Sequence, residues 1–274
     1  MQPSGEKTVR KAIAILLVLL LAACGRGQSS TAAAETCPEP PGIPAGELLL
    51  FGEMHGSAEA PALVSRLACV LSAPRELAVG LEIPTQDQPL IDAFLGSQGT
   101  PSDVAALTSS SFWQEGKDGR SSQAMLKLIE NIRAMKQSGK PVDLFAFDDQ
   151  PGTGLERNVA IANGIRRFHD AHPGARIVAL MGNVHAMQDK MYAGNETIVP
   201  SGYLLADLHP VSVLVMYPAG TIWACMPNCG IHRIAPRNPE TSPSGFREGA
   251  SLGGYSRSYL LPSITASLPA VPSK

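Results

Sequence analysis

The strongest constraint on the fold is an alternation of short apolar runs with segments of helical periodicity. The apolar runs are rich in strand-forming residues and span residues 47–51, 77–83, 142–147 and 176–181. Between them, apolar residues recur three or four positions apart, as on one helix face, over residues 60–73, 90–95, 123–138 and 155–169. Strands that are apolar on both faces need helices on both sides of the sheet. The pattern therefore predicts an α/β fold with a mainly parallel sheet flanked by helices.

Two regions depart from this alternation. Residues 96–120 are polar and rich in Gly and Ser, which indicates an insertion or a lid, with a short helix after Ser102. Residues 211–217 and 221–226 flank Pro218-Ala219-Gly220, a sequence suited to a type I turn. We therefore expect these two runs to form a C-terminal antiparallel hairpin extension of the sheet.

The N-terminal residues have the composition of an export signal. Three basic residues precede an apolar run that is too short for a membrane-spanning helix and ends in small residues. The sequence Leu21-Ala22-Ala23-Cys24-Gly25 resembles the lipobox of bacterial lipoproteins, which implies lipidation of Cys24. The residue after the cysteine is Gly25 rather than an acid, which is more typical of outer-membrane than of inner-membrane lipoproteins. We therefore expect a lipid-anchored protein of the bacterial cell envelope, held by the bilayer of the outer membrane and facing the periplasm. An ordinary cleaved signal with a free cysteine is the alternative.

These features divide the chain into four parts. We expect a lipoprotein signal peptide, a flexible tether, one α/β domain and a C-terminal loop-rich extension, in that order, at residues 1–23, 24–46, 47–237 and 238–274. The formal net charge is −2 and no stretch concentrates Lys and Arg, so we expect no nucleic-acid partner.

Four cysteines remain after Cys24, an even number that permits two disulfides in an exported chain. Cys225 and Cys229 are close enough in sequence to close a short loop, and we predict a disulfide between them. The alternative is a metal site formed by these two cysteines and His232. A disulfide between Cys37 and Cys69 then follows only by elimination.

Polar residues of similar kinds stand at the ends of the four predicted strands. Strand by strand, they are Glu53 and His55, then Glu82, then Asp148 and Asp149, then His185. Because the carboxyl ends of parallel strands lie along one edge of a sheet, we expect a polar site at that edge. Two imidazoles and several carboxylates can bind a divalent metal that activates water, or can carry out general acid–base hydrolysis without a metal.

Six short motifs occur in the order found in a known superfamily. They are GEMH at 52–55, GLE at 80–82, DGRSSQAM at 118–125, FAFDDQ at 145–150, ERNVAIA at 156–162 and GNVHA at 182–186. Together they resemble the superfamily of TIKI metalloproteases, TraB/PrgY proteins, erythromycin esterases and ChaN-like haem-binding lipoproteins. The resemblance covers about residues 47–217, and a lipoprotein of this length is most similar to the ChaN-like branch.

The resemblance implies a site built from five residues, namely Glu53, His55, Glu82, Arg157 and His185. Glu53, His55 and His185 would be the ligands of a divalent metal such as Mn²⁺, Co²⁺ or Zn²⁺. Arg157 would hold a carboxylate or an oxyanion of the substrate, or, as a structural alternative, pair with Glu82 or Asp148. The chain differs from the family in having Asn158 where an acid often follows the arginine.

Two functional hypotheses follow from these residues. The first is an exported hydrolase, metal-dependent or histidine-activated, that acts on an ester or peptide bond of a small molecule or peptide. The second is a non-catalytic lipoprotein that binds haem or another iron-bearing ligand for uptake, as the ChaN-like branch implies. Haem needs an axial ligand, and Tyr192, Tyr203 and Tyr217 are candidates that no spacing distinguishes. A degenerate scaffold protein is a third alternative.

Three other residues have structural interpretations that we prefer, and the role of a fourth, Arg120, is open. His169 and His172 stand at a predicted helix end, where histidines interact with the helix dipole. Trp113 is expected to pack in the interior. Arg120 either lines the pocket from the 96–120 insertion or fixes that loop.

Overall fold

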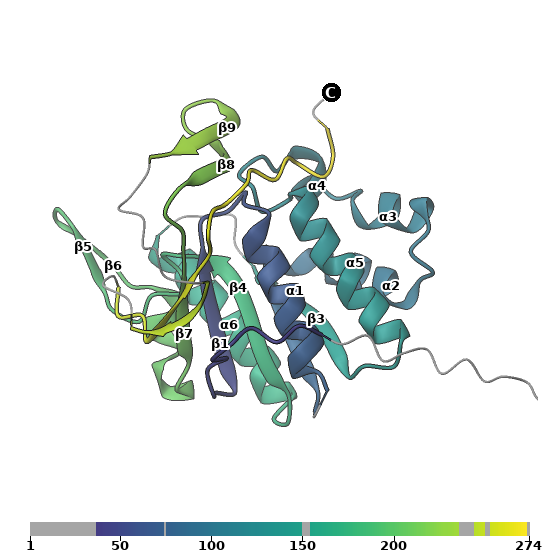
Figure 1. Ribbon diagram of the computed structural model, residues 1–274, viewed down its shortest axis with the longest axis horizontal. Coiled ribbons are helices and arrows are strands. Elements are labelled where there is room, and N and C mark those ends of the chain that lie inside the picture. The colour runs from purple at the N-terminus through teal and green to yellow at the C-terminus, as the bar shows by residue number, and fades with distance from the viewer. Residues whose placement is uncertain (1–36, 74, 150–153, 236–243, 250–252, 273–274) are drawn as a thin grey trace, which may run out of the picture. The chain divides into compact units, whose positions relative to one another are not determined.

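A parallel sheet forms the centre of the structure (Figure 1). The computed structural model describes residues 37–73, 75–149, 154–235, 244–249 and 253–272. Four strands of the sheet lie side by side in the order β1, β4, β2, β3 and are all parallel, with β3 at the edge. Their bounds are Leu48–Glu53 for β1, Leu77–Pro84 for β2, Val142–Asp148 for β3 and Arg176–Gly182 for β4. These are the four strands that the apolar runs predict, and the predicted fold class is confirmed.

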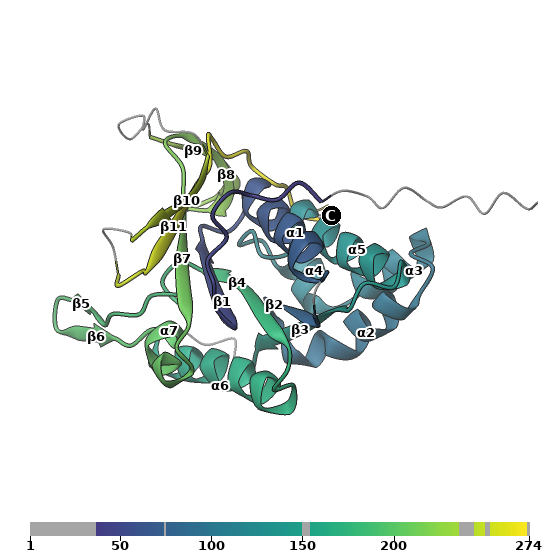
Figure 2. The same cartoon turned by 60° about the horizontal axis from the view of Figure 1, so that its bottom comes forward.

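Helices cover both faces of this sheet (Figure 2). On one face lie α1, α2 and α5, with bounds Glu59–Leu71, Gln88–Gly96 and Gln123–Gln137. On the other face lies α6, Leu155–Ala171, beside the one-turn helix α7, Ser201–Leu204. Short 3-10 helices span Thr85–Asp87 and Ala206–Leu208. The helices stand where the sequence periodicity predicts them.

The burial of β1 explains why its sequence is apolar at consecutive positions. Leu49 and Phe51 pack in the core that contains α1, α2 and α5. Leu48 and Leu50 point to the opposite face and pack in the core that contains α6. Successive side chains of a strand alternate between its faces, so a strand between two helical layers needs apolar residues at every position.

The 96–120 segment contains two short helices, α3 (Pro101–Leu107) and α4 (Ser111–Glu115). Thr100 begins α3 with a capping box, in which its side chain and that of Asp103 each accept a backbone N–H of the other residue. Trp113 is 1% exposed and belongs to the core on the α1 side, so its predicted packing role is confirmed.

The C-terminal third departs from the prediction. Strand β7, Val211–Met216, does not pair with the next strand but lies parallel to β1 at the centre of the sheet. Instead β8, Gly220–Cys225, pairs with β9, Cys229–Ile234, in a separate antiparallel hairpin. The predicted partner of 211–217 was therefore wrong. Val213 pairs with Phe51 of β1 and Val215 with Tyr259 of β11, and both valines are buried because β7 lies between two strands of the sheet.

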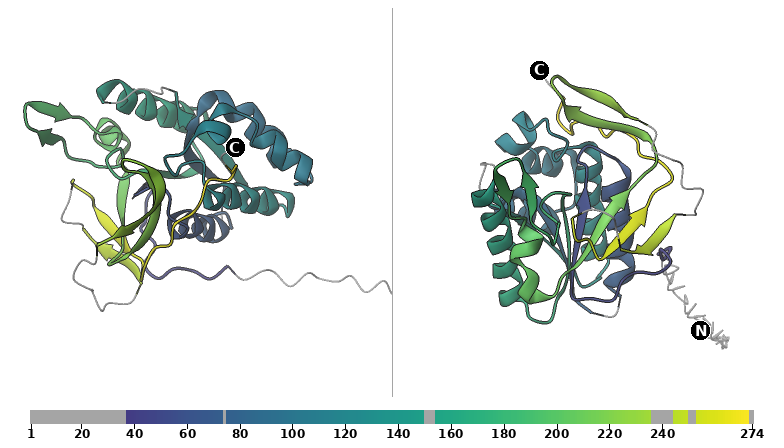
Figure 3. Two further views of the ribbon diagram at one scale, coloured as in Figure 1. Left: turned by 90° about the horizontal axis from the view of Figure 1, so that it is seen from above. Right: turned by 90° about the vertical axis from the view of Figure 1, so that its left-hand side faces the viewer.

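Two strands fall within the region predicted to be loop-rich. β10, Gly245–Glu248, and β11, Arg257–Leu260, are antiparallel to each other, and β11 adds to the sheet parallel to β7. The full sheet order is β10-β11-β7-β1-β4-β2-β3. A small hairpin of β5 (Met191–Ala193) and β6 (Glu196–Ile198) completes the strands of the described residues. Figure 3 shows β8–β9 and β10–β11 as separate hairpins.

Residues 264–270, which we call the C-terminal strap, run across the starts of α1 and α5 (Figures 1 and 3). Ser267 donates its backbone N–H to the carbonyl of Gly56 at 2.8 Å, next to His55. Ala270 donates to the carbonyl of Ser121 at 2.9 Å, next to Arg120. The strap therefore joins two loops that are distant in sequence.

Two disulfides are present, Cys37–Cys69 and Cys225–Cys229, and both predicted pairs are confirmed. The first joins the start of the described chain to α1, and the second joins β8 to β9. The alternative of a metal held by Cys225 and Cys229 falls with this pairing. The predicted signal peptide, Cys24 and the tether up to residue 36 lie outside the described residues. None of the helices in the described part of the chain has the length and apolar composition needed to cross a bilayer.

Candidate active site at the carboxyl edge of the sheet

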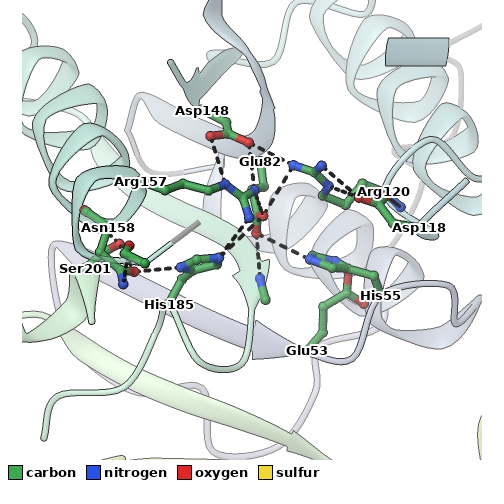
Figure 4. A network of polar contacts seen from close by, with 12 residues as sticks. Glu53, His55, Glu82, Asp118, Arg120, Asp148, Arg157, Asn158, His185 and Ser201 are labelled. Atoms are coloured by element: carbon green, nitrogen blue, oxygen red, sulfur yellow. Dashed lines mark hydrogen bonds and ion pairs between the residues drawn. The ribbon is translucent and has the colours of Figure 1, made fainter. Parts of the chain in front are cut away.

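The central strands bring their polar ends to one place, as expected for a parallel sheet (Figure 4). Glu53 is the last residue of β1, Asp148 the last of β3 and Gly182 the last of β4, while Glu82 lies near the end of β2. Two imidazoles and two guanidinium groups surround these acids. They belong to His55, His185, Arg120 and Arg157.

Glu82 is the centre of this cluster and is 2% exposed. Its Oε2 accepts the backbone N–H of Gly182 at 2.7 Å and lies 3.4 Å from His55 Nε2. Its Oε1 accepts from Arg157 Nη2 at 2.5 Å and lies 3.8 Å from His185 Nε2. Burial acts to raise the pKa of this carboxyl, but the histidines and Arg157 outweigh it and hold the pKa well below its usual range. Glu82 is therefore a buried anion held by neighbours on both of its oxygens.

Asp148 holds both guanidinium groups. Arg157 donates from Nε to Oδ1 at 3.3 Å and from Nη2 to Oδ2 at 2.8 Å, and Arg120 Nη1 donates to Oδ2 at 2.8 Å. A second acid, Asp118, accepts from Arg120 Nε at 2.8 Å. The side chains of Arg120 and Arg157 are 19% and 15% exposed, whereas Asp148 is 4% exposed. Glu82 and Asp148 thus form a buried floor, and the two guanidinium groups above it are more exposed than these acids.

His55 lies between two carboxylates. Its Nδ1 is 3.2 Å from Glu53 Oε1, and its Nε2 faces Glu82. Burial lowers the pKa of His55, but Glu82 and Glu53 outweigh this effect and raise the pKa to about 10. A carboxylate beside each ring nitrogen favours a proton on both nitrogens. His55 is therefore an imidazolium at neutral pH.

Glu53 has a carboxylate oxygen whose hydrogen-bonding capacity is unsatisfied within the described part of the chain. It is 3% exposed, and its Oε2 has no hydrogen-bond partner among the described residues. Burial raises the pKa of Glu53, and the hydrogen bond from His55 offsets only part of the rise.

His185 has different surroundings from His55. Its Nδ1 is 2.7 Å from Asn158 Oδ1, and its Nε2 is 3.3 Å from Arg157 Nη1. Burial lowers the pKa of His185, and the nearby charges of Arg157 and His55 lower it further, against the opposing effect of Glu82. The site therefore contains one charged and one neutral imidazole at neutral pH.

The structure brings together all five residues that the sequence singled out, namely Glu53, His55, Glu82, Arg157 and His185. The structural alternative for Arg157 is also present, because it pairs with Glu82 and Asp148. Asp149 does not join the cluster and instead pairs with Arg167. The histidines at the end of α6 make local contacts, His169 with Asp170 and His172 with the ring of Phe168.

Sequence reasoning expected Asp148 at this edge of the sheet and left the role of Arg120 open, but it did not assign Asn158 to the site. Asp148 was visible as a strand-end acid, and Arg120 as part of DGRSSQAM. Asn158 carried a signal too, since it replaces the acid of the family pattern directly after Arg157.

The three predicted metal ligands do not fit a metal centre well. Both ring nitrogens of His55 face carboxylates, and Arg157 Nη1 faces Nε2 of His185, where a metal ion would have to bind. Among the described residues, no group of three or more His, Cys, Asp or Glu side chains is arranged to hold a metal ion. We therefore derive no chemical step through a metal.

Comparisons with known proteins show what this fold is similar to. No family model matches the chain, and no curated protein matches its sequence. A mutant of the erythromycin esterase EreC in its open conformation is 11% identical, with a TM-score of 0.60 over 80% of this chain and 91% of that chain. A succinoglycan biosynthesis protein is 9% identical, with a TM-score of 0.62 over 81% and 89%. A Bacillus cereus protein is 10% identical, with a TM-score of 0.62 over 83% and 91%. The chain thus shares the fold of an erythromycin esterase, one of the groups that its motifs resemble.

Proposed function

We propose that the chain is a hydrolase of ester or peptide bonds that uses general acid–base chemistry at this cluster. The observation that carries the proposal is the pair of imidazoles on either side of Glu82, one held charged and the other neutral. Environments that push the pKa values of two neighbouring groups apart are typical of catalytic sites in which the two groups have different roles. The fold shared with an erythromycin esterase supports the same reaction class.

His185 is the proposed base. Because its pKa is lowered, its imidazole is available to accept a proton at neutral pH. A water oxygen attacks the carbonyl carbon of the substrate as its proton passes to Nε2 of His185. The tetrahedral intermediate then breaks its bond to the leaving oxygen or nitrogen, which takes that proton from His185. The products are a carboxylic acid and an alcohol or amine.

His55 and the arginines are proposed to stabilise the oxyanion. A pKa of about 10 makes His55 a poor proton donor at neutral pH but a lasting positive charge. Its Nε2 is 3.4 Å from Glu82, a long contact that leaves this N–H able to turn toward a substrate oxygen. Positioned donors beside a developing oxyanion contribute roughly 10²–10³-fold to rate each. Glu82 and Asp148 hold these cations in place before substrate binds.

The test is hydrolysis by purified protein of panels of esters and peptides, with and without chelator and with added Mn²⁺, Co²⁺ or Zn²⁺. We expect turnover that the chelator leaves unchanged, and a loss of roughly 10²–10⁴-fold in His185→Ala. His172→Ala, a histidine outside the cluster, is the matched control and should retain full activity. Absence of turnover, or unchanged turnover in His185→Ala and Glu53→Gln, contradicts the proposal. Activity that depends on an added metal would support the metal-dependent hypothesis instead.

The haem-binding alternative stays a prediction. Of its candidate ligands, Tyr192 is 77% exposed on the β5–β6 hairpin and Tyr203 is 39% exposed. Titration with haem, followed by its Soret band, tests this alternative directly.

We also propose a location in the cell envelope, with Cys24 as the lipid anchor. The two disulfides support export, because disulfides persist mainly in oxidising compartments. Fractionation of cells that produce Cys24→Ser tests the anchor, and we expect this variant to leave the membrane fraction.

A further inference from the structure

We propose that Asn158 is the positioning residue that fixes the tautomer of His185, with the proton on Nδ1 and the lone pair on Nε2. This inference rests on the proposed function for its catalytic meaning, since it specifies which ring nitrogen acts as the base. The tautomer of His185 can be measured without any substrate.

The side-chain amide of Asn158 lies in the first turn of α6 and has a defined orientation. The residue is 2% exposed, and its Nδ2 donates to the carbonyl of Gly154 at 3.2 Å. The amide oxygen must therefore face the other way, toward His185 Nδ1 at 2.7 Å. Because this oxygen can only accept a hydrogen bond, Nδ1 of His185 must carry the proton.

Ser201 holds the amide from the other side. Its hydroxyl lies 3.1 Å from Asn158 Oδ1 and 3.0 Å from the backbone carbonyl of Asn158, and the residue is fully buried at the start of α7. A buried amide with partners on both of its ends cannot rotate without losing a hydrogen bond.

The second ring nitrogen of His185 leads to the same tautomer. Its Nε2 faces Arg157 Nη1 at 3.3 Å, and a guanidinium can only donate. This contact favours a lone pair on Nε2, but at 3.3 Å it is longer than the 2.7 Å contact between Nδ1 and Asn158. Arg157 is also held by Asp148, so Asn158 is the stronger determinant of the tautomer. Glu82 Oε1 is more distant from Nε2, at 3.8 Å, and already accepts from Arg157 Nη2. The two nearest neighbours of the ring thus agree on a neutral imidazole whose lone pair is on Nε2, facing Arg157.

An amide suits this position better than an acid does. A carboxylate beside Nδ1 would accept the same hydrogen bond, but it would also favour the charged form of His185. Asn158 orients the ring without adding a negative charge. Its presence in place of the acid of the family pattern is therefore compatible with a retained base.

The experiment is ¹H–¹⁵N NMR of the purified protein labelled with ¹⁵N-histidine, recorded at one neutral pH. The ring signals of His185 are assigned by their loss in His185→Gln. We expect a protonated Nδ1 and an unprotonated Nε2 for this residue. Asn158→Leu, which is similar in size but has no acceptor, should lose that signature. Asn158→Asp, which keeps an oxygen acceptor, should restore the N–H on Nδ1.

Kinetics separates positioning from a purely structural role. On any substrate that the protein hydrolyses, Asn158→Leu should lower kcat roughly 10²-fold, at the low end of what a positioned base contributes, with KM nearly unchanged. A proton on Nε2 in the wild type, or an unchanged His185 tautomer in Asn158→Leu, overturns the inference. If Asn158→Leu does not fold, Asn158→Ala, which also lacks the acceptor, provides the same comparison. The expected tautomer without hydrolysis would contradict the proposed function but support the role of Asn158.

Discussion

The pKa of His55 predicts that the protein becomes less stable as the pH rises from neutral to alkaline. The pKa is about 10 in the folded state against an ordinary value of 6.5. A group whose pKa is raised by folding contributes its full stabilisation below its unfolded pKa and loses it as the pH approaches the folded pKa. The stabilising contribution of His55 should therefore be complete near pH 6.5 and be lost progressively toward pH 10.

The size of the effect follows from the same two values. A tenfold change in proton affinity corresponds to about 1.4 kcal/mol, so the free energy of unfolding should fall by at most ~5 kcal/mol over the whole range. The side chain of His55 is 20% exposed, and solvent screening reduces the effect. We expect a loss of roughly 2–4 kcal/mol, with a slope of up to about 1.4 kcal/mol for each pH unit between pH 7 and pH 9.

The assay is urea denaturation of the wild type and His55→Gln at pH 6.5, 8.0 and 9.5. The four cysteines of the described residues are all in disulfides, so thiol exchange within that part of the chain does not complicate the alkaline points. His55→Gln should be less stable at pH 6.5, because it leaves Glu82 without one of its neighbours, but its stability should vary much less with pH. If the free energy of unfolding falls by the same amount in both proteins between pH 6.5 and pH 9.5, His55 is not the cause and the prediction is wrong.

Three other perturbations have defined outcomes. Glu82→Gln removes one of the two buried carboxylates that pair with Arg120 and Arg157 and should lower the free energy of unfolding by about 3–5 kcal/mol in urea titrations; a loss below about 1 kcal/mol would contradict the central role of Glu82. Replacing both Cys37 and Cys69 with Ser should lower the free energy of unfolding by about 4 kcal/mol, and replacing both Cys225 and Cys229 should lower it by about 2 kcal/mol. The difference is expected because the first pair is 32 residues apart in sequence and the second only 4. Equal thermal shifts in the two double variants would argue against this entropic origin. Truncation after Leu261, which removes the strap, should lower kcat while far-UV circular dichroism stays close to that of the wild type; full activity without the strap would show that it does not position the site.

The parallel core could be predicted from the sequence because its signals are local. Each central strand is apolar on both faces, and each flanking helix repeats its apolar residues at the helical spacing. Strand β11 gave no such signal. It lies between β10 and β7, second from one end of the sheet, and it follows residues rich in Pro, Ser and Gly. Its strand conformation depends on a partner more than 40 residues earlier in the chain, and periodicity within a window does not report such pairing.

The same distinction applies to the site. Glu53, Glu82 and His185 could be predicted because a parallel sheet places strand ends at one edge. Arg120 comes from a loop that only tertiary contacts position. A Cβ atom on Gly119, the preceding residue, would lie 2.5 Å from the backbone nitrogen of Gly56, so glycine is needed for the two loops to meet. No spacing along the sequence reveals a contact between residues 56 and 119.

The C-terminal strap has a consequence for the time at which the site can form. Thr265 donates its backbone N–H to Glu59, a residue that precedes it by 206 positions, and its neighbour Ser267 binds the carbonyl next to His55. A ribosome must therefore synthesise almost the whole length described here before the loop of His55 obtains its final support. The loop of His55 would therefore reach its final geometry only after the late residues of the chain have emerged.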